Sequence, residues 1–421
     1  MGTFSFVGRA LIDGEVKPAA VRVQDGLIQG VRSAADPGAG TVVELNAKQI
    51  LLPSAIDMLA AARDWGEAHR DTVETVTRAA LAGGITVLCD QPNTLPRINT
   101  PELVARRAAT FAQQSYVDYG LQSHPPHEDV SLAPELREAG AFGLTFFQWD
   151  MPPWNMPFDV DHTKERMGRY AAAGLQGMAF IEELAMRETP LEDEAEQWAV
   201  NHLLRRLHPD FSLRVVVTLA ESVSKLAAAK KDFPNLRLQT APHYLCMSRE
   251  VAYERIGCAA GHSPPLRSRE NLAALQALAA EGVFDVFASQ HAPHRTPDKH
   301  NTDPEPGELK PKRGFTSIDI AYPVLLHYIG VPQTCKSFCE TPARLLGVRK
   351  GRIAAGYEAD LVIAEEGRWP VDPDLFQSKG KVTPFVGEKL RYRIRKTFLR
   401  GVEVFDAESG VFTRTPARHI R

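Results

Sequence analysis

The stretch from Ala55 to Gly66, AIDMLAAARDWG, places two side chains capable of chemistry close together. Asp57 offers a carboxylate, and Arg63 offers a guanidinium that can grip a carboxylate with two parallel hydrogen bonds. Between them, where metal-binding imidazoles could stand, lie residues without a lone pair, namely Leu59, Ala60, Ala61 and Ala62. The stretch is therefore either an active site built in another way or an active site that has lost its chemistry.

Other side chains could rebuild a metal site elsewhere. His124 and His127 in QSHPPHED, together with Glu182 and Glu183, offer imidazole and carboxylate ligands, which suit zinc. The prolines between the two histidines indicate a loop, and loop histidines are more often solvated than bound to metal. A nucleophilic site is not indicated, because Ser222 lacks a GxSxG context and no cysteine lies beside a plausible base.

The elements that would position these groups follow a repeating pattern from about residue 51. Short apolar runs such as GGITVLCDQ, GAFGLTFFQ, GLQGMAFIEE and LRVVVTLAE alternate with stretches such as DTVETVTRAALAG, which have helical spacing and end in glycine. Alternating strands and helices predict βα units around a parallel sheet. Enough units occur to close a (β/α)₈ barrel over residues 54–344, so the predicted fold class is α/β.

Both ends of the sequence instead show patterns typical of β-strands. TFSFVGRALID and AAVRVQDGLIQGVR alternate apolar and polar residues, and YRIRKTFLRGVEVFDA is typical of a closing hairpin. We therefore predict one composite β-sandwich domain made from residues 1–53 and 345–421.

Composition and charge argue against several classes of protein. The 421 residues carry a formal net charge of -3, which gives no basic face for nucleic acid. The five cysteines show no CxxC pair, which favours reduced thiols in a cytoplasmic protein. No apolar run approaches the ~18 residues of a membrane span, and no basic, apolar leader opens the sequence.

Two further segments attract attention. Thr296 to Gly314 is the longest irregular stretch, and since it follows a predicted barrel strand we expect it over the C-terminal mouth of the barrel, as one of two candidate contact surfaces. Gln148 to Asp161, QWDMPPWNMPFDVD, is rich in the aromatic residues and methionines that anchor interfaces. The second segment either forms a contact surface or folds inward and plugs the mouth.

An ordered series of motifs covers nearly the whole chain: PSAID, RAALAGGITVLCDQPNTLP, TLAESV, APHYL, HSPPLRSRENLAALQALAAEGVFDVFASQHAPH, TPARLLGV and KGRIAAGYEADLVI. This series resembles the dihydroorotase branch of the amidohydrolase superfamily. The resemblance implies a (β/α)₈ barrel with a β-sandwich from both termini. It also implies interconversion of carbamoyl aspartate and dihydroorotate, with zinc that polarises an amide carbonyl and supplies hydroxide.

The family's six metal ligands are an HxH pair, a carboxylated lysine, two further histidines and an aspartate. Carried over by motif, these positions fall in the same order on Leu59 and Ala61, Thr145, Phe180 and Val216, and Gln290. Four of the six are hydrocarbon, a threonine hydroxyl cannot carry the bridging carbamate, and an amide cannot shuttle a proton near pH 7. Since a metal needs several convergent donors, the resemblance implies a lost zinc site, no cofactor and no catalytic residue.

The family's clamp for the substrate carboxylate is retained, on Arg63, Asn93 and His294. These residues could still bind dihydroorotate or carbamoyl aspartate. Alternatively, Arg63 pairs with a neighbouring carboxylate and His294 is an ordinary loop histidine. Ser263 in HSPPLR stands where the family often has an asparagine beside the substrate, which departs from the ligand-binding pattern.

Three hypotheses follow. The first is an inactive dihydroorotase-like protein of pyrimidine biosynthesis that acts as a non-catalytic partner of aspartate carbamoyltransferase, with or without self-association, as the family resemblance implies. The second is an active cyclic-amide hydrolase with an atypical site, and the third is a sensor that binds a carboxylate ligand. Loss of chemistry with retention of the fold is compatible with the first, because function resides in sites carried by a fold.

Overall fold

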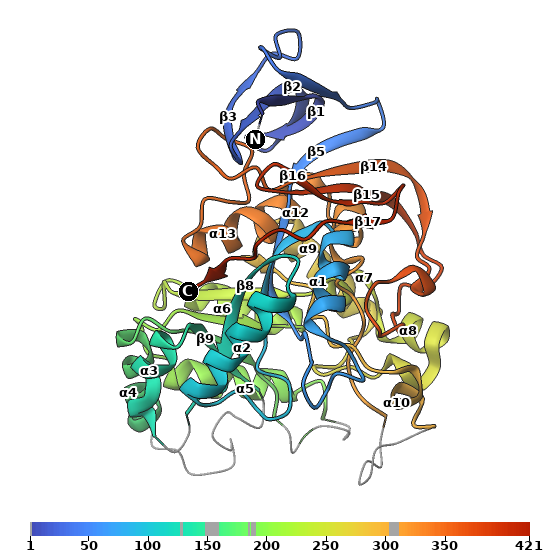
Figure 1. The fold of residues 1–421 in the computed structure, drawn as a ribbon. Coiled ribbons are helices and arrows are strands. Elements are labelled where there is room, and N and C mark those ends of the chain that lie inside the picture. The colour runs from blue at the N-terminus through green and yellow to red at the C-terminus, as the bar shows by residue number, and fades with distance from the viewer. Residues whose placement is uncertain (1, 127–128, 148–159, 184–185, 187–190, 303–310) are drawn as a thin grey trace.

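The computed structural model describes every residue except 1, 127–128, 148–159, 184–185, 187–190 and 303–310. Two sheets lie one above the other in Figure 1, and the barrel helices surround the lower one. The loops at the carboxyl ends of the barrel strands lie at the end of the molecule remote from the upper sheet (Figure 1).

Eight parallel strands form the barrel in the sequential order β6 to β13. Their bounds are β6 Ala55–Ala60, β7 Ile85–Asp90, β8 Asp118–Ser123, β9 Ala141–Phe146, β10 Gln176–Phe180, β11 Leu213–Val216, β12 Leu236–Thr240 and β13 Val286–Phe287. An isolated parallel bridge between Ala60 and His291 brings the last strand region back to the first. The predicted α/β barrel fold is confirmed.

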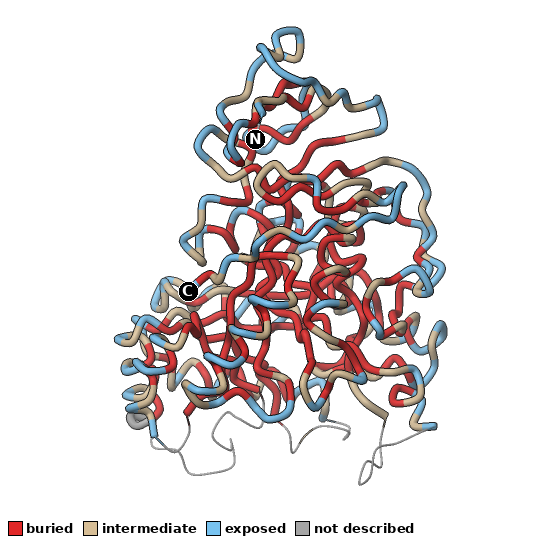
Figure 2. The backbone as a smooth tube through the Cα atoms, viewed as in Figure 1, coloured by how far each residue is buried: buried red, intermediate tan, exposed pale blue. Residues whose placement is uncertain are grey.

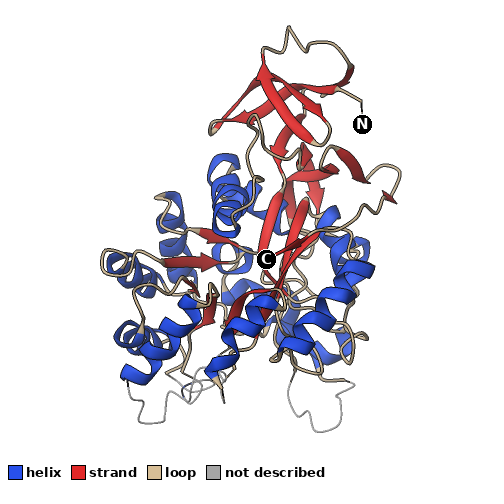
Figure 3. Ribbon diagram, turned by 60° about the vertical axis from the view of Figure 1, so that its left-hand side comes forward, coloured by secondary structure: helices blue, strands red, loops and turns tan. Residues whose placement is uncertain are grey.

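Helices follow the barrel strands and cover their outer side (Figure 3). The helices are α1 Val73–Ala82, α2 Pro101–Gln114, α3 Ala133–Glu138, α4 Val160–Ala172, α5 Ala195–Arg206, α6 Ala220–Ala229, α7 Pro242–Cys246, α8 Arg249–Ile256, α9 Arg269–Ala280, α10 Thr296–His300, α11 Ala321–Tyr328, α12 Val331–Cys335 and α13 Thr341–Leu346. Short 3₁₀ turns occupy Val130–Leu132, Gly257–Ala260 and Pro373–Leu375, and a π-helical turn occupies Lys336–Glu340. Among the described residues, no helix combines the length and apolar character needed to cross a bilayer.

The second sheet combines strands from both parts of the chain that flank the barrel. Its strands are β1 Phe4–Ile12, β2 Glu15–Gln24, β3 Leu27–Arg32, β4 Thr41–Glu44, β5 Gln49–Pro53, β14 Leu361–Pro370, β15 Lys389–Leu399, β16 Val402–Asp406 and β17 Val411–Phe412. The two groups meet where β5 pairs antiparallel with β14. All nine strands are linked by hydrogen bonds into one continuous sheet, and β15 with β16 forms the expected hairpin.

A last short strand, β18 (His419–Ile420), adds to the barrel sheet rather than to the second sheet. It pairs in parallel with the start of β8, and the His419 ring stacks on Tyr119 with centroids 4.8 Å apart. The core of the molecule is concentrated along the barrel strands, which are coloured as buried along most of their length in Figure 2.

One sequence expectation about the loops is wrong. The segment from Thr296 begins with helix α10 rather than with irregular chain. Asp298 explains the helix, because its carboxylate accepts a hydrogen bond from the backbone N–H of Arg295 and pairs with the Arg295 guanidinium at 2.5 Å. Residues 303–310 of that segment and 148–159 of the Gln148–Asp161 segment lie outside the described residues, so the interface expectation for the latter stays a prediction.

Candidate functional site

The six positions that the sequence resemblance assigns to the family's metal ligands lie at the carboxyl ends of the barrel strands. Each is at most 5% exposed: Leu59, Ala61, Thr145, Phe180, Val216 and Gln290. The first two stand at and just after the end of β6, the next three are in β9, β10 and β11, and the last follows β13. The barrel thus brings these residues to the end of the sheet where a family metal centre would be assembled.

The side chains at these positions do not fit a zinc centre. Four of the six have only carbon in their side chains and offer no lone pair. The Thr145 hydroxyl donates to Gln122 Oε1 at 3.1 Å, and the Gln290 amide donates to Tyr244 Oη at 3.1 Å. The two remaining polar groups thus bind different protein partners, and the six side chains do not form a set of metal donors.

Aromatic rings occupy part of the same region. Phe180 stacks on Phe147 with centroids 5.5 Å apart and an interplanar angle of 21°, and His124 lies against Phe147 at 5.4 Å. Apolar contacts of this kind take the place of a coordination shell at the end of β10.

The alternative metal ligands do not converge within the described part of the chain. The only described group of three or more His, Cys, Asp or Glu residues with ligand atoms within 4.8 Å of one another is Asp118, Glu358 and Asp360. Asp118 begins strand β8, whereas His124 follows the other end of that strand. His124, Glu182 and Glu183 form no such group, and His127 lies outside the described residues.

Two of the three carboxylate-clamp residues are brought together. Arg63 Nη2 lies 3.3 Å from His294 Nε2, and both side chains are buried. Arg63 also approaches Glu67 at 4.0 Å, but Glu67 has its closer partner in Arg70 at 2.5 Å. Asn93 is half-buried in the loop after β7. Both the clamp and the pairing with a neighbouring carboxylate therefore have a geometric basis.

The turn that carries Arg63 has an uncommon backbone. Arg63, Asp64 and Trp65 have φ values of 52°, 69° and 50°, a left-handed run that costs energy for non-glycine residues. The Asp64 carboxylate holds this turn by accepting from the backbone N–H groups of Trp65 at 2.7 Å and Val73 at 3.0 Å. Burial, and then the charge of Arg63, lowers the pKa of His294 well below its usual value, so its imidazole is neutral at pH 7.

A polar network inside the barrel was not foreseen from the sequence. Arg214 on β11 is 1% exposed and donates to Met58 O at 3.1 Å, to Gln239 Oε1 at 3.0 Å and to Gln122 Oε1 at 3.5 Å. Its Nε has no hydrogen-bond partner, nor do the amide nitrogens of Gln122 and Gln239. Its signal in the sequence is a charged residue inside the apolar run LRVVVTLAE.

Asp57 lies in the same interior. Its Oδ1 accepts from the backbone N–H groups of Leu59 at 3.1 Å and Ser289 at 3.0 Å, whereas Oδ2 has no partner. Burial raises the pKa of this carboxyl to about 6, against the lowering effect of these hydrogen bonds and of the Arg214 charge. No ion pair within 4.0 Å joins Arg214 to a carboxylate of the described chain.

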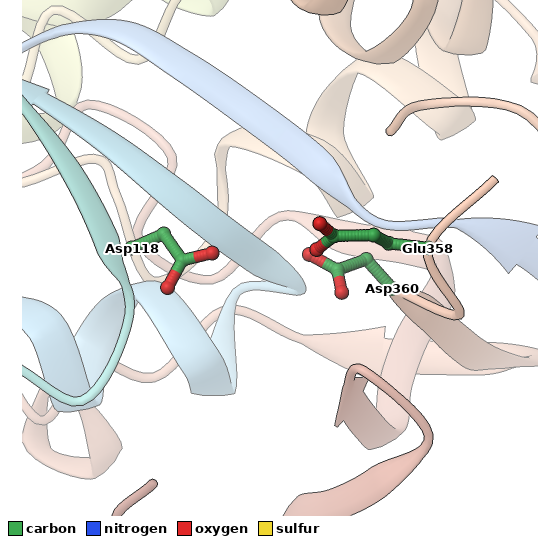
Figure 4. Close-up of side chains that lie close together, drawn as sticks. All are labelled: Asp118, Glu358 and Asp360. Atoms are coloured by element: carbon green, nitrogen blue, oxygen red, sulfur yellow. The ribbon is translucent and has the colours of Figure 1, made fainter. Parts of the chain in front are cut away.

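The opposite end of the barrel holds a second group of charges, which we call the base cluster: Asp118, Glu358, Asp360, Lys350, Arg400 and Arg418. Figure 4 shows the carboxylates of Asp118, Glu358 and Asp360 gathered around one space. The Lys350 ammonium lies 3.1, 2.7 and 2.5 Å from them, in that order. Although burial lowers it, these carboxylates hold the pKa of Lys350 above its usual value, so a lysine supplies the positive charge that a cation would supply there.

Comparison with known proteins agrees with this architecture. The model of the amidohydrolase family matches residues 194–404, half of the chain. The L-hydantoinase (dihydropyrimidinase) of Arthrobacter aurescens superposes with a TM-score of 0.86 at 21% identity, covering 99% of this chain and 98% of that one. A D-hydantoinase superposes with a TM-score of 0.83 at 20% identity over 98% and 97% of the two chains. The chain belongs to the amidohydrolase family.

Within that family, the chain is similar in sequence to dihydroorotases and to an allantoinase. A dihydroorotase of Anaplasma phagocytophilum (strain HZ) is 28% identical over 88% of this chain and 86% of its own. A dihydroorotase of Listeria welshimeri is 26% identical over 93% and 96%, and an allantoinase of Streptomyces avermitilis is 26% identical over 97% and 96%. The protein is a dihydroorotase-like amidohydrolase.

Proposed function

We propose that this protein is a catalytically inactive member of the dihydroorotase branch. The observation that carries the proposal is the chemistry at the six ligand positions, where four side chains are hydrocarbon and the other two bind protein partners. Hydrolysis of a cyclic amide at neutral pH needs an activated water and a group that stabilises the developing oxyanion. None of the six residues supplies either.

The test combines two measurements on one preparation: zinc per chain by elemental analysis, and dihydroorotate hydrolysis with and without added zinc. A dihydroorotase that carries all six ligands is the positive control. We expect no stoichiometric zinc and no turnover. Zinc bound at one equivalent or more, together with turnover, would overturn the proposal and establish an active hydrolase with an atypical site.

The partner proposal rests on the dihydroorotase resemblance. We propose that the chain acts in pyrimidine biosynthesis by associating with aspartate carbamoyltransferase. Size-exclusion chromatography with light scattering, on each protein alone and on their mixture, tests this directly. A complex of defined stoichiometry is expected, and two unchanged peaks at micromolar concentrations of both proteins would contradict it. The chain measured alone also tests self-association.

A second candidate function is favoured by the Arg63–His294 contact. A buried guanidinium with an unpartnered Nε beside a neutral imidazole is suited to bind a carboxylate. On this proposal, dihydroorotate or carbamoyl aspartate binds without turnover, and Arg63→Gln weakens binding at least tenfold. Arg97→Gln, at an exposed position, is the matched control. Equal calorimetric affinities for the wild-type protein and Arg63→Gln would contradict it.

A further inference from the structure

Cys258 differs from the other four cysteines of this chain because it is exposed. All five are free thiols, and Cys89, Cys246, Cys335 and Cys339 are buried. Burial raises the pKa of Cys89 to about 12 and raises those of Cys246 and Cys339 well above the ordinary value. Since the thiolate is the nucleophile and buried structural cysteines are inert, thiol chemistry of the folded protein falls to Cys258.

A histidine from another element lies beside this thiol. Cys258 belongs to the 3₁₀ turn Gly257–Ala260, and Gly257 permits this turn because its φ of 55° is strained for other residues. His300 ends helix α10, and its Nδ1 lies 3.7 Å from Cys258 Sγ. In the tautomer with its proton on Nε2, Nδ1 can accept the proton of the thiol.

Lys299, the residue before His300, adds a buried positive charge. It is 1% exposed, its Nζ donates to the carbonyl oxygen of Gly261 at 2.7 Å, and no carboxylate of the described chain pairs with it. Burial, and then the charge of Arg313, lowers the pKa of Lys299 to about 7, whereas Cys258 raises it. An ammonium without a carboxylate partner attracts negative charge, and the Cys258 sulfur is close enough to act on it.

A cavity of about 700 Å³ opens beside Cys258, on the side of the molecule where Figure 1 shows α8 and α10. Its lining comes from the end of α8, the 3₁₀ turn, α10 and the segment between β14 and β15. Small-molecule sites have volumes of about 300–1,000 Å³. The cavity is therefore large enough to hold a group attached to the Cys258 sulfur.

Charged residues of both signs line this cavity: Arg255, Lys381, Asp372 and Asp374. Arg255 already pairs with Glu388 at 2.7 Å. Lys381 donates to a backbone carbonyl oxygen at 2.6 Å and has no carboxylate partner in the described part of the chain. Asp372 and Asp374 are exposed and form no ion pair with another described residue. A group that carries both carboxylates and an ammonium would complement these charges.

We propose that Cys258 undergoes thiol–disulfide exchange with a small zwitterionic disulfide, and that the half that becomes attached occupies this cavity. The thiol proton passes to His300 Nδ1 as the sulfur attacks one sulfur of the reagent. A new S–S bond forms to Cys258, the S–S bond of the reagent breaks, and the departing thiolate takes the proton from the imidazolium. The inference is independent of the proposed function, because no carboxylate-clamp residue and none of the six ligand positions takes part.

The first experiment locates the reaction. We would incubate the reduced full-length protein with glutathione disulfide, each half of which carries an ammonium and two carboxylates, and analyse intact protein and tryptic peptides by mass spectrometry. One glutathionyl group per chain is expected, on the peptide of residues 256–267 that contains Cys258. Cys258→Ser should stay unmodified. No modification of the wild type, or equal modification of Cys258→Ser, would overturn the proposal.

The second experiment tests His300 as the proton acceptor. His300→Gln should react at least tenfold more slowly with glutathione disulfide. It should also react more slowly with iodoacetamide, a small alkylating agent that does not need the cavity. His208→Gln, at a half-buried histidine after helix α5, is the matched control and should react as the wild type does. Circular dichroism verifies that both variants fold. Equal rates for His300→Gln and the wild type with both reagents would contradict the proposal.

The third experiment tests the cavity. If the disulfide binds before it reacts, the observed rate levels off as the concentration of glutathione disulfide rises, whereas an exposed thiol without a binding site gives a linear dependence. We expect saturation with glutathione disulfide and a linear dependence with the uncharged bis(2-hydroxyethyl) disulfide. Lys381→Gln should raise the half-saturating concentration at least threefold, and Lys389→Gln, at an exposed lysine outside the lining, is the control. A linear dependence with both disulfides, or an unchanged half-saturating concentration in Lys381→Gln, would refute the assignment of the cavity.

Discussion

Two groups of charge in this molecule, the base cluster and the residues Asp57 and Arg214 inside the barrel, are organised in opposite ways. In the base cluster, three carboxylates face three cations, with contacts of 2.5 to 3.1 Å around Lys350 and of 2.7 Å from Arg400 to Asp118 and from Arg418 to Glu358. Inside the barrel, Arg214 has amide and carbonyl partners but no ion pair, and Asp57 keeps an unpartnered oxygen. Charge compensation is thus complete where the barrel meets the second sheet and incomplete inside the barrel.

The difference follows from what each group connects. The base cluster joins β8 to the segment before β14 and therefore links the barrel to the second sheet. Asp57 and Arg214 instead lie within strands of the barrel, and their hydrogen-bond partners belong to the barrel as well.

The largest expected loss of stability follows a substitution in the base cluster. Lys350→Met leaves three carboxylates around an apolar side chain, and breaking a buried pair in this way costs about 3–5 kcal/mol of the free energy of unfolding. Urea denaturation followed by circular dichroism measures it. Arg352→Met is the control, since Arg352 pairs with Asp13 at the surface at 3.3 Å and such pairs contribute about 0–1 kcal/mol. Equal losses in the two variants would remove the basis of the comparison.

The second largest expected effect is a pH-dependent contribution of Asp57 to stability. Because burial raises the pKa of Asp57 from 3.8 to about 6, the folded state binds this proton more tightly than the unfolded state does. Stability therefore falls as pH rises from about 4 to 6, by about 3 kcal/mol, and is constant above that range with respect to this group. Asp57→Asn removes this component and keeps the Oδ1 acceptor.

The measurement is the difference in unfolding free energy between the wild type and Asp57→Asn at pH 4.5, 5.5 and 7.5. Other titrating groups are common to both proteins and cancel. The variant should gain stability relative to the wild type as pH rises. A difference that does not change with pH would show that Asp57 titrates as an ordinary carboxyl.

The smallest effect is expected at Arg214. Arg214→Met loses hydrogen bonds but also removes a buried cation that has no ion pair, so at pH 5 the net loss is about 1 kcal/mol. Arg214→Lys is the matched variant that retains the charge and should be less stable than Arg214→Met, because a lysine cannot reach three acceptors in one plane. If Arg214→Met lost as much free energy of unfolding as Lys350→Met, the two groups of charge would contribute equally to stability, contrary to the comparison.

Much of the fold was accessible from the sequence because it depends on repeating local patterns. Runs such as GGITVLCDQ and GAFGLTFFQ contain β7 and β9, and the alternation with helices predicts the parallel barrel. Helix α10 was not predicted, because TPDKH has little helical pattern and its start is fixed by one side-chain contact between Arg295 and Asp298.

In the candidate site, too, some features follow from local sequence patterns and others do not. Motif order predicts the six positions assigned to the metal ligands, since each lies beside residues that resemble the family pattern, and the structure brings these six to the carboxyl ends of the barrel strands. The interior network needs Gln122, Arg214 and Gln239 from three strands, and no local spacing relates them. The approach of Glu67 to Arg63 is not predictable from the sequence either. It depends on a turn with left-handed backbone, which the residues RDW do not predict.

The pairing of β18 with β8 has a consequence for the order in which the molecule is made. Asp118, at the start of β8, accepts from the backbone N–H of Arg418 at 2.8 Å and from the Arg400 guanidinium, and β8 receives its extra strand from residues 419–420. About 300 residues of synthesis separate these partners, which at 5–20 residues per second is of the order of 15–60 s. During that interval a nascent barrel emerging from the ribosome carries Asp118 without these partners, so β8 waits for a segment that is synthesised much later.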